Sequence, residues 1–451
     1  MSVAGSRNRR SFKAAWALGL ALVGAASMCY YEFGLFMPRV EEVRAAKHLR
    51  GEYSFGDDFY PIWLTSREWL HDRRDPYSPA VTRDIQIGLF GRALDGQFAT
   101  DPPSDYRTFA YPAFTNLLFW PLSAISFPVL RIAWTAILVT LLAACVALWT
   151  QALSWHVSRM WLAIICLLTV CSYPELEGLY AGQLGLLVGF LLAASLLALV
   201  RKRLMLSGIL MALTTIKPQM TGLAILYLLI WSVQDWRSRS RFTWAFLSTM
   251  LVLVTTSLAV WPHWIGSWMH VVLAYPRYAT PPLGGELLGA RSGSYGADAA
   301  TIIFLIVALV LAWRSRAAAL GSRECWLTLS LLLAIATISI LPGQSVHDHV
   351  ILLPGIFLLG SGKEPQRRSP IFRVLVALGA AVLLWPWVAA AALITLHPFI
   401  RSEYFYSKAV FVLPLRTAAA FPFVVLGLLT MAWRAFYLQQ RNLESSSLRV
   451  R

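Results

Sequence analysis

The stretch of sequence that decides the fold class is an apolar run that ends in a cluster of positive charge. Residues 179–203 read LYAGQLGLLVGFLLAASLLALVRKR, and no charged residue interrupts residues 179–200. A run of this length is typical of an α-helix that crosses a lipid bilayer, which needs about 20 apolar residues. A transmembrane β-strand, in contrast, needs about 10 residues that alternate between polar and apolar. The run therefore favours a helical membrane protein over a β-barrel.

The composition of the whole chain supports the same fold class. Its 451 residues are 57% hydrophobic and 14% charged, and its mean hydropathy is +0.59. A soluble globular domain is about 45–50% apolar and about one quarter charged. A soluble fold of the present composition would expose large apolar patches, and disorder and a disulfide scaffold are excluded as well. The sequence predicts an all-α polytopic membrane protein.

Apolar segments recur along the chain, and 13 of them are candidate membrane spans. The first ends near Met37, and the others cover 112–127, 129–150, 158–174, 179–200, 204–216, 219–233, 242–264, 299–313, 324–342, 348–361, 371–396 and 411–437. Clusters of Lys and Arg stand before, between and after these runs, at 7–13, 201–203, 237–241, 314–323, 367–373 and from Arg434 onward. Since such clusters gather on the cytoplasmic side, both ends of the chain are expected there, which requires an even number of crossings. We expect about 12, with one candidate within 112–200 re-entrant or merged with its neighbour.

The formal net charge of +16 has two interpretations. It could indicate a nucleic acid or another acidic partner, or it could follow from the excess of Lys and Arg in cytoplasmic loops. The positive residues cluster between apolar runs, which favours the second interpretation. We therefore expect membrane lipids, and no nucleic acid, around this protein.

This topology divides the chain into four regions. They are a cytoplasmic N-terminus with the first transmembrane helix (1–37), an outer, periplasmic loop (38–110), a multi-span domain (111–437) and a cytoplasmic tail (438–451). The outer loop holds about half of the chain's 23 acidic residues. Within it, Ile62–Leu70 and Val81–Phe90 mix apolar and charged residues at helical spacing, which predicts short helices in the membrane interface. We expect the protein in the cytoplasmic membrane with its active site facing outside.

Lys217 stands between two apolar runs and is followed by Pro218, which breaks helices. Ionisable residues at membrane depth are expensive and often functional. One interpretation is a cation aimed at an anionic substrate, and the other is a lysine that snorkels from a helix end to the membrane surface.

Residues 343–349 and the pair Asp57-Asp58 are the other polar candidates. His347 and His349 flank Asp348, so a metal site is one interpretation. We favour an imidazole that hydrogen-bonds a phosphate or hydroxyl, because positions i and i+2 of a helix do not share a face. The aspartate pair could be solvated, or one carboxylate could act as a general base.

Known nucleotide and cofactor motifs are absent from the sequence. It contains no P-loop, no dinucleotide-binding glycine pattern, no serine elbow and no zinc signature. We therefore expect no cofactor, no metal and no soluble nucleotide as substrate.

An ordered set of short motifs resembles glycosyltransferase family 87, whose members use polyprenyl-phosphate sugars and have a GT-C-type membrane fold. The motifs are, in chain order, DFYPIW (58–63), DPY (75–77), FAYP (109–112), GQ (182–183), KP (217–218) and LP (341–342), followed by His347 and LP (353–354). Mannosyltransferases are the best-known members. The chain departs from the usual family pattern at three places. Gly185 replaces a frequent Asn, Ala113 replaces a frequent Pro, and Asp348 separates two histidines that are often adjacent.

The resemblance implies roles for individual residues. Asp58 matches the presumed catalytic base at the start of the first outer loop, and His347 matches the histidine of the late motif. The chemistry adds a second requirement, because loss of the sugar leaves a phosphate with more negative charge, which Lys217, Arg107 and His347 could balance. Further donor or substrate contacts are expected from Gln183, Tyr111, Tyr60, Asp348 and His349.

Taken together, the sequence predicts an inverting membrane hexosyltransferase. It would move a sugar, with mannose favoured, from a polyprenyl-phosphate donor to a lipid or glycan acceptor. The alternatives are a transporter or flippase of a lipid-linked intermediate and a polymerase or ligase of polysaccharide. Transporters often show repeated halves, and no internal repeat is evident here.

Overall fold

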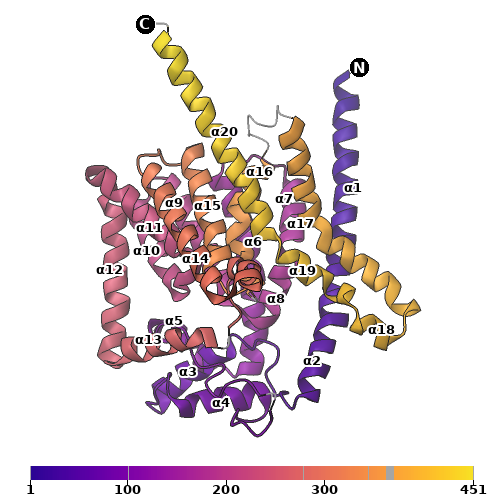
Figure 1. Cartoon of the computed structure of the whole chain (residues 1–451), viewed down its shortest axis with the longest axis vertical. Helices are drawn as coiled ribbons and strands as arrows, with labels where there is room; N and C mark the ends of the chain where they lie inside the picture. The colour runs from indigo at the N-terminus through magenta and orange to yellow at the C-terminus, as the bar shows by residue number, and fades with distance from the viewer. Residues whose placement is uncertain (1, 100, 278, 344, 362–369, 450–451) are drawn as a thin grey trace.

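The computed structural model describes residues 2–99, 101–277, 279–343, 345–361 and 370–449, and this part of the chain is built from helices without a β-strand. The predicted all-α class is thereby confirmed. Helix α1 (Ser2–Tyr30) begins, and helix α20 (Phe421–Arg449) ends, at the same end of the molecule (Figure 1). The basic residues Arg367 and Arg368, and Gln344 of the late polar segment, lie outside the described residues.

The first span is longer than predicted. Helix α1 (Ser2–Tyr30) continues through one π-helical segment (Tyr31–Phe36) into α2 (Met37–Ala46). The predicted end near Met37 marks only the point at which the sequence becomes polar. Past it, ion pairs one turn apart, Arg39–Glu42 at 2.8 Å and Arg44–Glu41 at 3.3 Å, support the helix in water.

A layer of short helices lies at the end of the molecule opposite the start of α1 and the end of α20 (Figure 1). It contains α3 (Tyr60–His71), α4 (Pro79–Phe90), α5 (Phe114–Phe119) and α13 (Trp264–Ala274). Helices α3 and α4 confirm the two amphipathic helices predicted for the outer loop. Ser78 caps α4 by accepting from the Val81 amide, and Gly91 ends it in a left-handed conformation.

Two segments differ from the pattern of candidate spans. The candidate span 112–127 is instead the six-residue α5 followed by a 3₁₀ helix over Trp120–Ala124, interrupted by Pro121 and too short to cross a bilayer. Residues 265–298, which lie between two candidate spans, are largely helical, because α13 starts at Trp264 and α14 covers Leu283–Arg314. Removing 112–127 from the 13 candidates leaves an even number, as termini on one side require.

Among the described residues, five helical segments are long and apolar enough to cross a membrane by themselves. They are Ala14–Ala46, Phe127–Ala152 (α6), Trp236–Val260 (α12), Pro370–Phe399, which contains α17 (Pro370–Leu396), and Ala409–Arg441, which contains the short α19 (Leu413–Ala418) and most of α20. A sixth is counted if α7 (Arg159–Val170) and α8 (Tyr173–Ala181), which meet at 60°, form one broken span. The total of about 12 crossings therefore stays a prediction.

The interior is filled by shorter apolar helices. They are α9 (Leu184–Val200), α10 (Leu204–Leu213), α11 (Pro218–Gln234), α15 (Arg323–Ser339) and α16 (Leu353–Gly360), which follows a 3₁₀ helix over Val346–Leu352. Helix α9 packs against α6 and α10, and α11 packs against α15. The helix ends that carry Gln183, Lys217 and His347 consequently stop inside the protein, beneath the layer of short helices.

Candidate active site

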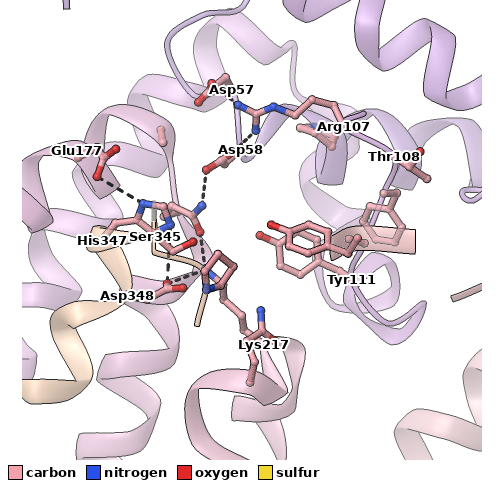
Figure 2. A pocket seen from close by; sticks show the side chains of 18 of the residues that line it. Asp57, Asp58, Arg107, Thr108, Tyr111, Glu177, Lys217, Ser345, His347 and Asp348 are labelled. Atoms are coloured by element: carbon pink, nitrogen blue, oxygen red, sulfur yellow. Dashed lines mark hydrogen bonds and ion pairs between the residues drawn. The ribbon is translucent and has the colours of Figure 1, made fainter. Parts of the chain in front are cut away.

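A cavity of about 700 Å³ lies between the layer of short helices and the inner helix ends. Its lining includes most of the residues predicted from sequence: Asp58, Arg107, Tyr111, Gln183, Lys217, His347 and Asp348. They come from segments up to 290 positions apart along the chain. Figure 2 shows Asp58 and Arg107 together, Lys217 apart from them, and Tyr111 facing His347 across the opening.

The backbone around Asp58 is fastened to the end of helix α8. The Asp58 amide donates to the Ala181 carbonyl at 3.0 Å, and the Gly56 amide donates to the Tyr180 carbonyl at 2.9 Å. Helix α8 ends there because Gly182 adopts φ +70°, a conformation that favours glycine. The side chain of Asp58 therefore starts from a fixed position although it belongs to a loop.

Arg107 binds both carboxylates of the aspartate pair. One terminal nitrogen donates to Asp57 Oδ2 at 2.9 Å and the other donates to Asp58 Oδ1. Its backbone has φ +68°, which is uncommon for a residue with a side chain and is often found at functional sites. Arg44 of α2 gives Asp57 a second cation at 3.3 Å. Asp57 is thus held by two guanidinium groups and Asp58 by one.

The surroundings shift the pKa values of the two aspartates in opposite directions. Burial raises the pKa of Asp57, and Arg107 and Arg44 offset this only in part. Burial also acts to raise the pKa of Asp58, but the positive charge of Arg107, helped by His347 and Lys217, outweighs it and holds the pKa below the usual aspartate value. Asp58 is therefore the more readily ionised of the two carboxylates.

Lys217 lies at the turn between α10 and α11 and is 6% exposed. Its ammonium donates to Asp348 Oδ1 at 2.6 Å and to Gln183 Oε1 at 3.1 Å. The turn is closed by a 2.9 Å hydrogen bond between the hydroxyls of Thr214 and Thr221. The short limbs on either side place this cation within the protein rather than at its surface.

Gln183 joins the two charged groups. Its side-chain nitrogen donates to Asp58 Oδ2, and its side-chain oxygen accepts from Lys217. One amide therefore separates the carboxylate from the ammonium. The cavity has an anionic position and a cationic position held at a fixed separation.

His347 lies between two carboxylates. Its Nδ1 is 3.7 Å from Glu177 Oε2 and its Nε2 is 3.9 Å from Asp348 Oδ1. Both distances exceed a normal hydrogen bond but are within ion-pair range. A positive charge on His347 would be favoured by this setting.

Tyr111 is held by its backbone. The Tyr77 hydroxyl donates to the Tyr111 carbonyl at 2.8 Å, and the Trp268 indole donates to the neighbouring Ala110 carbonyl at 2.9 Å. Burial, followed by the nearby Asp58, raises the pKa of Tyr111 well above its usual value. Its phenol therefore remains a hydrogen-bond donor at physiological pH.

Two predicted residues are not brought to this lining. Tyr60 packs among aromatic rings, with centroids 4.6 Å from Tyr53 and 5.0 Å from Phe127. His349 is buried on the 3₁₀ helix behind His347, and its Nδ1 has no hydrogen-bond partner among the described residues. Both residues belong to the segments that the sequence indicated as functional. The side chains of these segments that do reach the cavity include those of Asp58, His347 and Asp348.

Several lining residues were missed from the sequence. Arg44 was missed because the first helix was expected to end before it. Glu177 is the sole carboxylate of α8 in the lining. Its place six positions before Gln183 was the signal from which it could have been predicted. Tyr275 and Trp268 belong to the segment between the candidate spans 242–264 and 299–313.

The cavity has apolar margins on two flanks. Phe36, Met37 and Val40 of the first helix line one side, and Trp268 and Val272 of α13 line another. Val272 is 38% exposed, so it faces both the cavity and the outside of the protein. Among the described side chains, no group of three His, Cys, Asp or Glu is arranged to hold a metal ion.

Comparison with known proteins gives one match. The sequence profile of glycosyltransferase family 87 matches residues 109–342, just over half of the chain. No curated protein and no solved structure matches the chain. The matched segment contains Tyr111, Gln183 and Lys217, whereas Asp58 lies before it and His347 after it.

Proposed function

Because the chain belongs to glycosyltransferase family 87 and is a membrane glycosyltransferase, we propose that it transfers a sugar from a polyprenyl-phosphate donor to a lipid or glycan acceptor. Mannose is the sugar that the sequence resemblance favours. The reaction takes place on the outer face of the cytoplasmic membrane and inverts the anomeric centre. In this proposal the chain has a GT-C-type fold with about 12 crossings.

The observation that carries the proposal is the arrangement of Asp58, Gln183 and Lys217 in one cavity. A single displacement at a sugar needs a base on the side of the attacking hydroxyl and positive charge on the side of the leaving phosphate. The carboxylate and the ammonium, separated by one amide, provide these two functions at two positions.

In the proposed reaction, Asp58 accepts the proton of the acceptor hydroxyl. The hydroxyl oxygen forms a bond to the anomeric carbon, while the bond between that carbon and the phosphate oxygen breaks. The leaving polyprenyl phosphate keeps the electron pair, so its charge changes from one negative unit to two. The ionised state of Asp58, maintained by Arg107, prepares it for this role.

Lys217 is better placed than Arg107 to balance the charge on the leaving phosphate. Both terminal nitrogens of Arg107 contact the aspartates and so lie on the side of the base. The base and the leaving group are on opposite faces of the sugar in an inverting displacement. Lys217 reaches Asp58 only through Gln183, which puts its charge farther away.

The apolar margins support a lipid-linked donor. A polyprenyl chain is insoluble in water and needs a route from the bilayer to the cavity. Val272 and its exposed neighbours on α13, Met269 at 44% and Leu273 at 73%, offer such a route from the membrane interface.

The test is a transfer assay with purified protein in lipid nanodiscs. The donors are polyprenyl-phosphate mannose and, in parallel, the corresponding glucose and arabinose compounds, each with a radiolabelled sugar. A labelled lipid or glycan product that requires Asp58 supports the proposal. In proteoliposomes that contain the same protein, movement of the labelled donor across the membrane without a new glycosidic bond would favour the transporter alternative and contradict the proposal.

A further inference from the structure

Helix α9 begins beside Lys217, and its second residue is Gly185. A Cβ atom added to Gly185 would lie 2.3 Å from Asp348 Oδ1 and 3.6 Å from Lys217 Nζ. Real Cβ atoms are not found that close to another heavy atom. The carboxylate of Asp348 therefore occupies the space in which residue 185 of any other type would place its side chain.

Two other glycines also lie close to the 3₁₀ helix over Val346–Leu352. A Cβ on Gly178 would meet His347 Cβ at 3.0 Å, and a Cβ on Gly189 would meet the Val350 methyls at 2.7 and 2.8 Å. Glycines of α8 and α9 thus let this segment lie directly against the two helices. Asp348 is the carboxylate of this segment, and its charged partner is a cation.

The partner is Lys217, and the pair is buried. The side chains of Lys217 and Asp348 are 8% and 1% exposed, and Nζ and Oδ1 are 2.6 Å apart. A buried ammonium without a counter-ion is costly, and removing one member of a buried pair is strongly destabilising. A lysine also has four rotatable bonds, so its charge reaches one place only if a partner holds it there.

We propose that Asp348 is a positioning residue that holds Lys217 at the cavity as its buried counter-ion, and that Gly185 is the glycine that makes room for it. The inference rests on the proposed function only for the ligand of Lys217.

The test uses full-length protein in nanodiscs and two sets of variants. In the first set, Lys217→Met and Asp348→Ala are measured singly and together by thermal unfolding. Each single change leaves the other group buried without its partner and should lower the unfolding midpoint. The double variant should recover much of that loss. Additive losses would show that Asp348 is not the counter-ion of Lys217.

In the second set, Gly185→Asn, Asp348→Ala and the combination of both are compared. Gly185→Asn alone should lower both the unfolding midpoint and sugar transfer, and Asp348→Ala alone should reduce transfer on the order of tenfold. The combination should recover transfer, because an Asn amide oxygen at position 185 is within reach of the Lys217 ammonium.

The matched control is the pair Gly185→Ala and Asp348→Ala, which relieves the steric conflict but offers Lys217 no acceptor. It should recover the stability lost to the steric conflict, keep the loss caused by Asp348→Ala, and not recover transfer. Equal recovery of transfer by Ala and Asn at position 185 would overturn the positioning role. If wild-type protein transfers no sugar from any donor, the proposed function fails, and the thermal measurements still decide whether Asp348 holds Lys217.

Discussion

The two charged clusters of the cavity are built in different ways. The outer cluster stands on loops, and the side chains of Asp57, Asp58 and Arg107 are 10%, 19% and 23% exposed. The inner cluster of Lys217 and Asp348 stands at the ends of apolar helical segments and is 8% and 1% exposed. The outer cluster shares cations among neighbouring carboxylates, whereas the inner one matches a single ammonium with a single carboxylate.

This difference separates two tasks. A partly exposed carboxylate with one guanidinium and one amide contact can exchange a proton with a substrate hydroxyl. A fully buried ion pair keeps its geometry and acts on charge that develops nearby, where the surroundings are poorly polarisable. Changes in the outer cluster should therefore affect the chemical step first, and changes in the inner cluster should affect donor binding and stability as well.

The largest effect is expected for the proposed base. Asp58→Asn keeps the shape of the side chain and removes its ability to accept a proton, so kcat should fall by about 10²–10⁴-fold. The matched control is Asp57→Asn, which changes the neighbouring carboxylate that two arginines already bind. Sugar transfer by both variants, measured with saturating donor, sharpens the comparison within the outer cluster. Equal losses, or an active Asp58→Asn variant, would remove Asp58 from this role.

A smaller effect on turnover and a larger one on binding are expected at Lys217. Lys217→Ala removes the ammonium near the leaving phosphate and should raise KM for the donor, together with a weaker affinity for geranylgeranyl phosphate. Lys217→Arg should recover only part of the affinity, because a planar guanidinium does not replace a compact charge held by Asp348 and Gln183. An alanine variant with undiminished affinity would return Lys217 to the role of a snorkelling lysine.

Arg107 is expected to set the acidic limit of activity. Its charge holds the pKa of Asp58 below the usual value, so wild-type kcat/KM should not fall through protonation of Asp58 between about pH 8 and pH 5. In Arg107→Gln, burial is less opposed and the pKa of Asp58 rises. Activity of that variant should therefore be lost as the pH falls and be retained best at high pH.

The control for this pH profile is Arg44→Gln, since Arg44 contacts Asp57 and not Asp58. Its kcat/KM should keep the wild-type dependence on pH. The same acidic loss in both variants would mean that the pH effect does not arise from the Arg107–Asp58 contact.

The smallest effect is expected from chelation. In the proposed mechanism Lys217 and the arginines supply the positive charge, so EDTA should leave sugar transfer unchanged. A loss of activity that one added divalent metal restores would contradict this mechanism and direct attention to Asp57, Asp58 and the histidines as ligands.

The fold and part of the site could be predicted because their signals are local. Apolar runs identified the helices, and the charged residues Lys217 and Asp58 stood out at the edges of such runs. The runs on either side of Lys217, 204–216 and 219–233, are short, and the turn between them is buried. The extension of the first helix to Ala46 was missed because polar sequence can still be helical when ion pairs support it. Helix α13 was missed because its 11 residues are too few for a membrane span.

The remaining features depend on contacts between distant segments. No residue near Gly185 in the sequence indicates that Asp348, 163 positions later, fills the space beside it. Likewise, Arg107 could be identified as a cation but not as the partner of both aspartates. Tyr60 shows the opposite error, because its place in a motif gave no information on the direction of its side chain.

The central claim is that the outer and inner clusters form one site on the outer side of the membrane. It is tested by single cysteines at positions 58, 217 and 347 in a variant that lacks the five native cysteines, labelled in intact cells with a membrane-impermeant thiol reagent. All three positions should react from outside, with position 58 fastest and the buried position 217 slowest. Labelling of position 217 or 347 only from the cytoplasmic side would separate the two clusters and contradict the account.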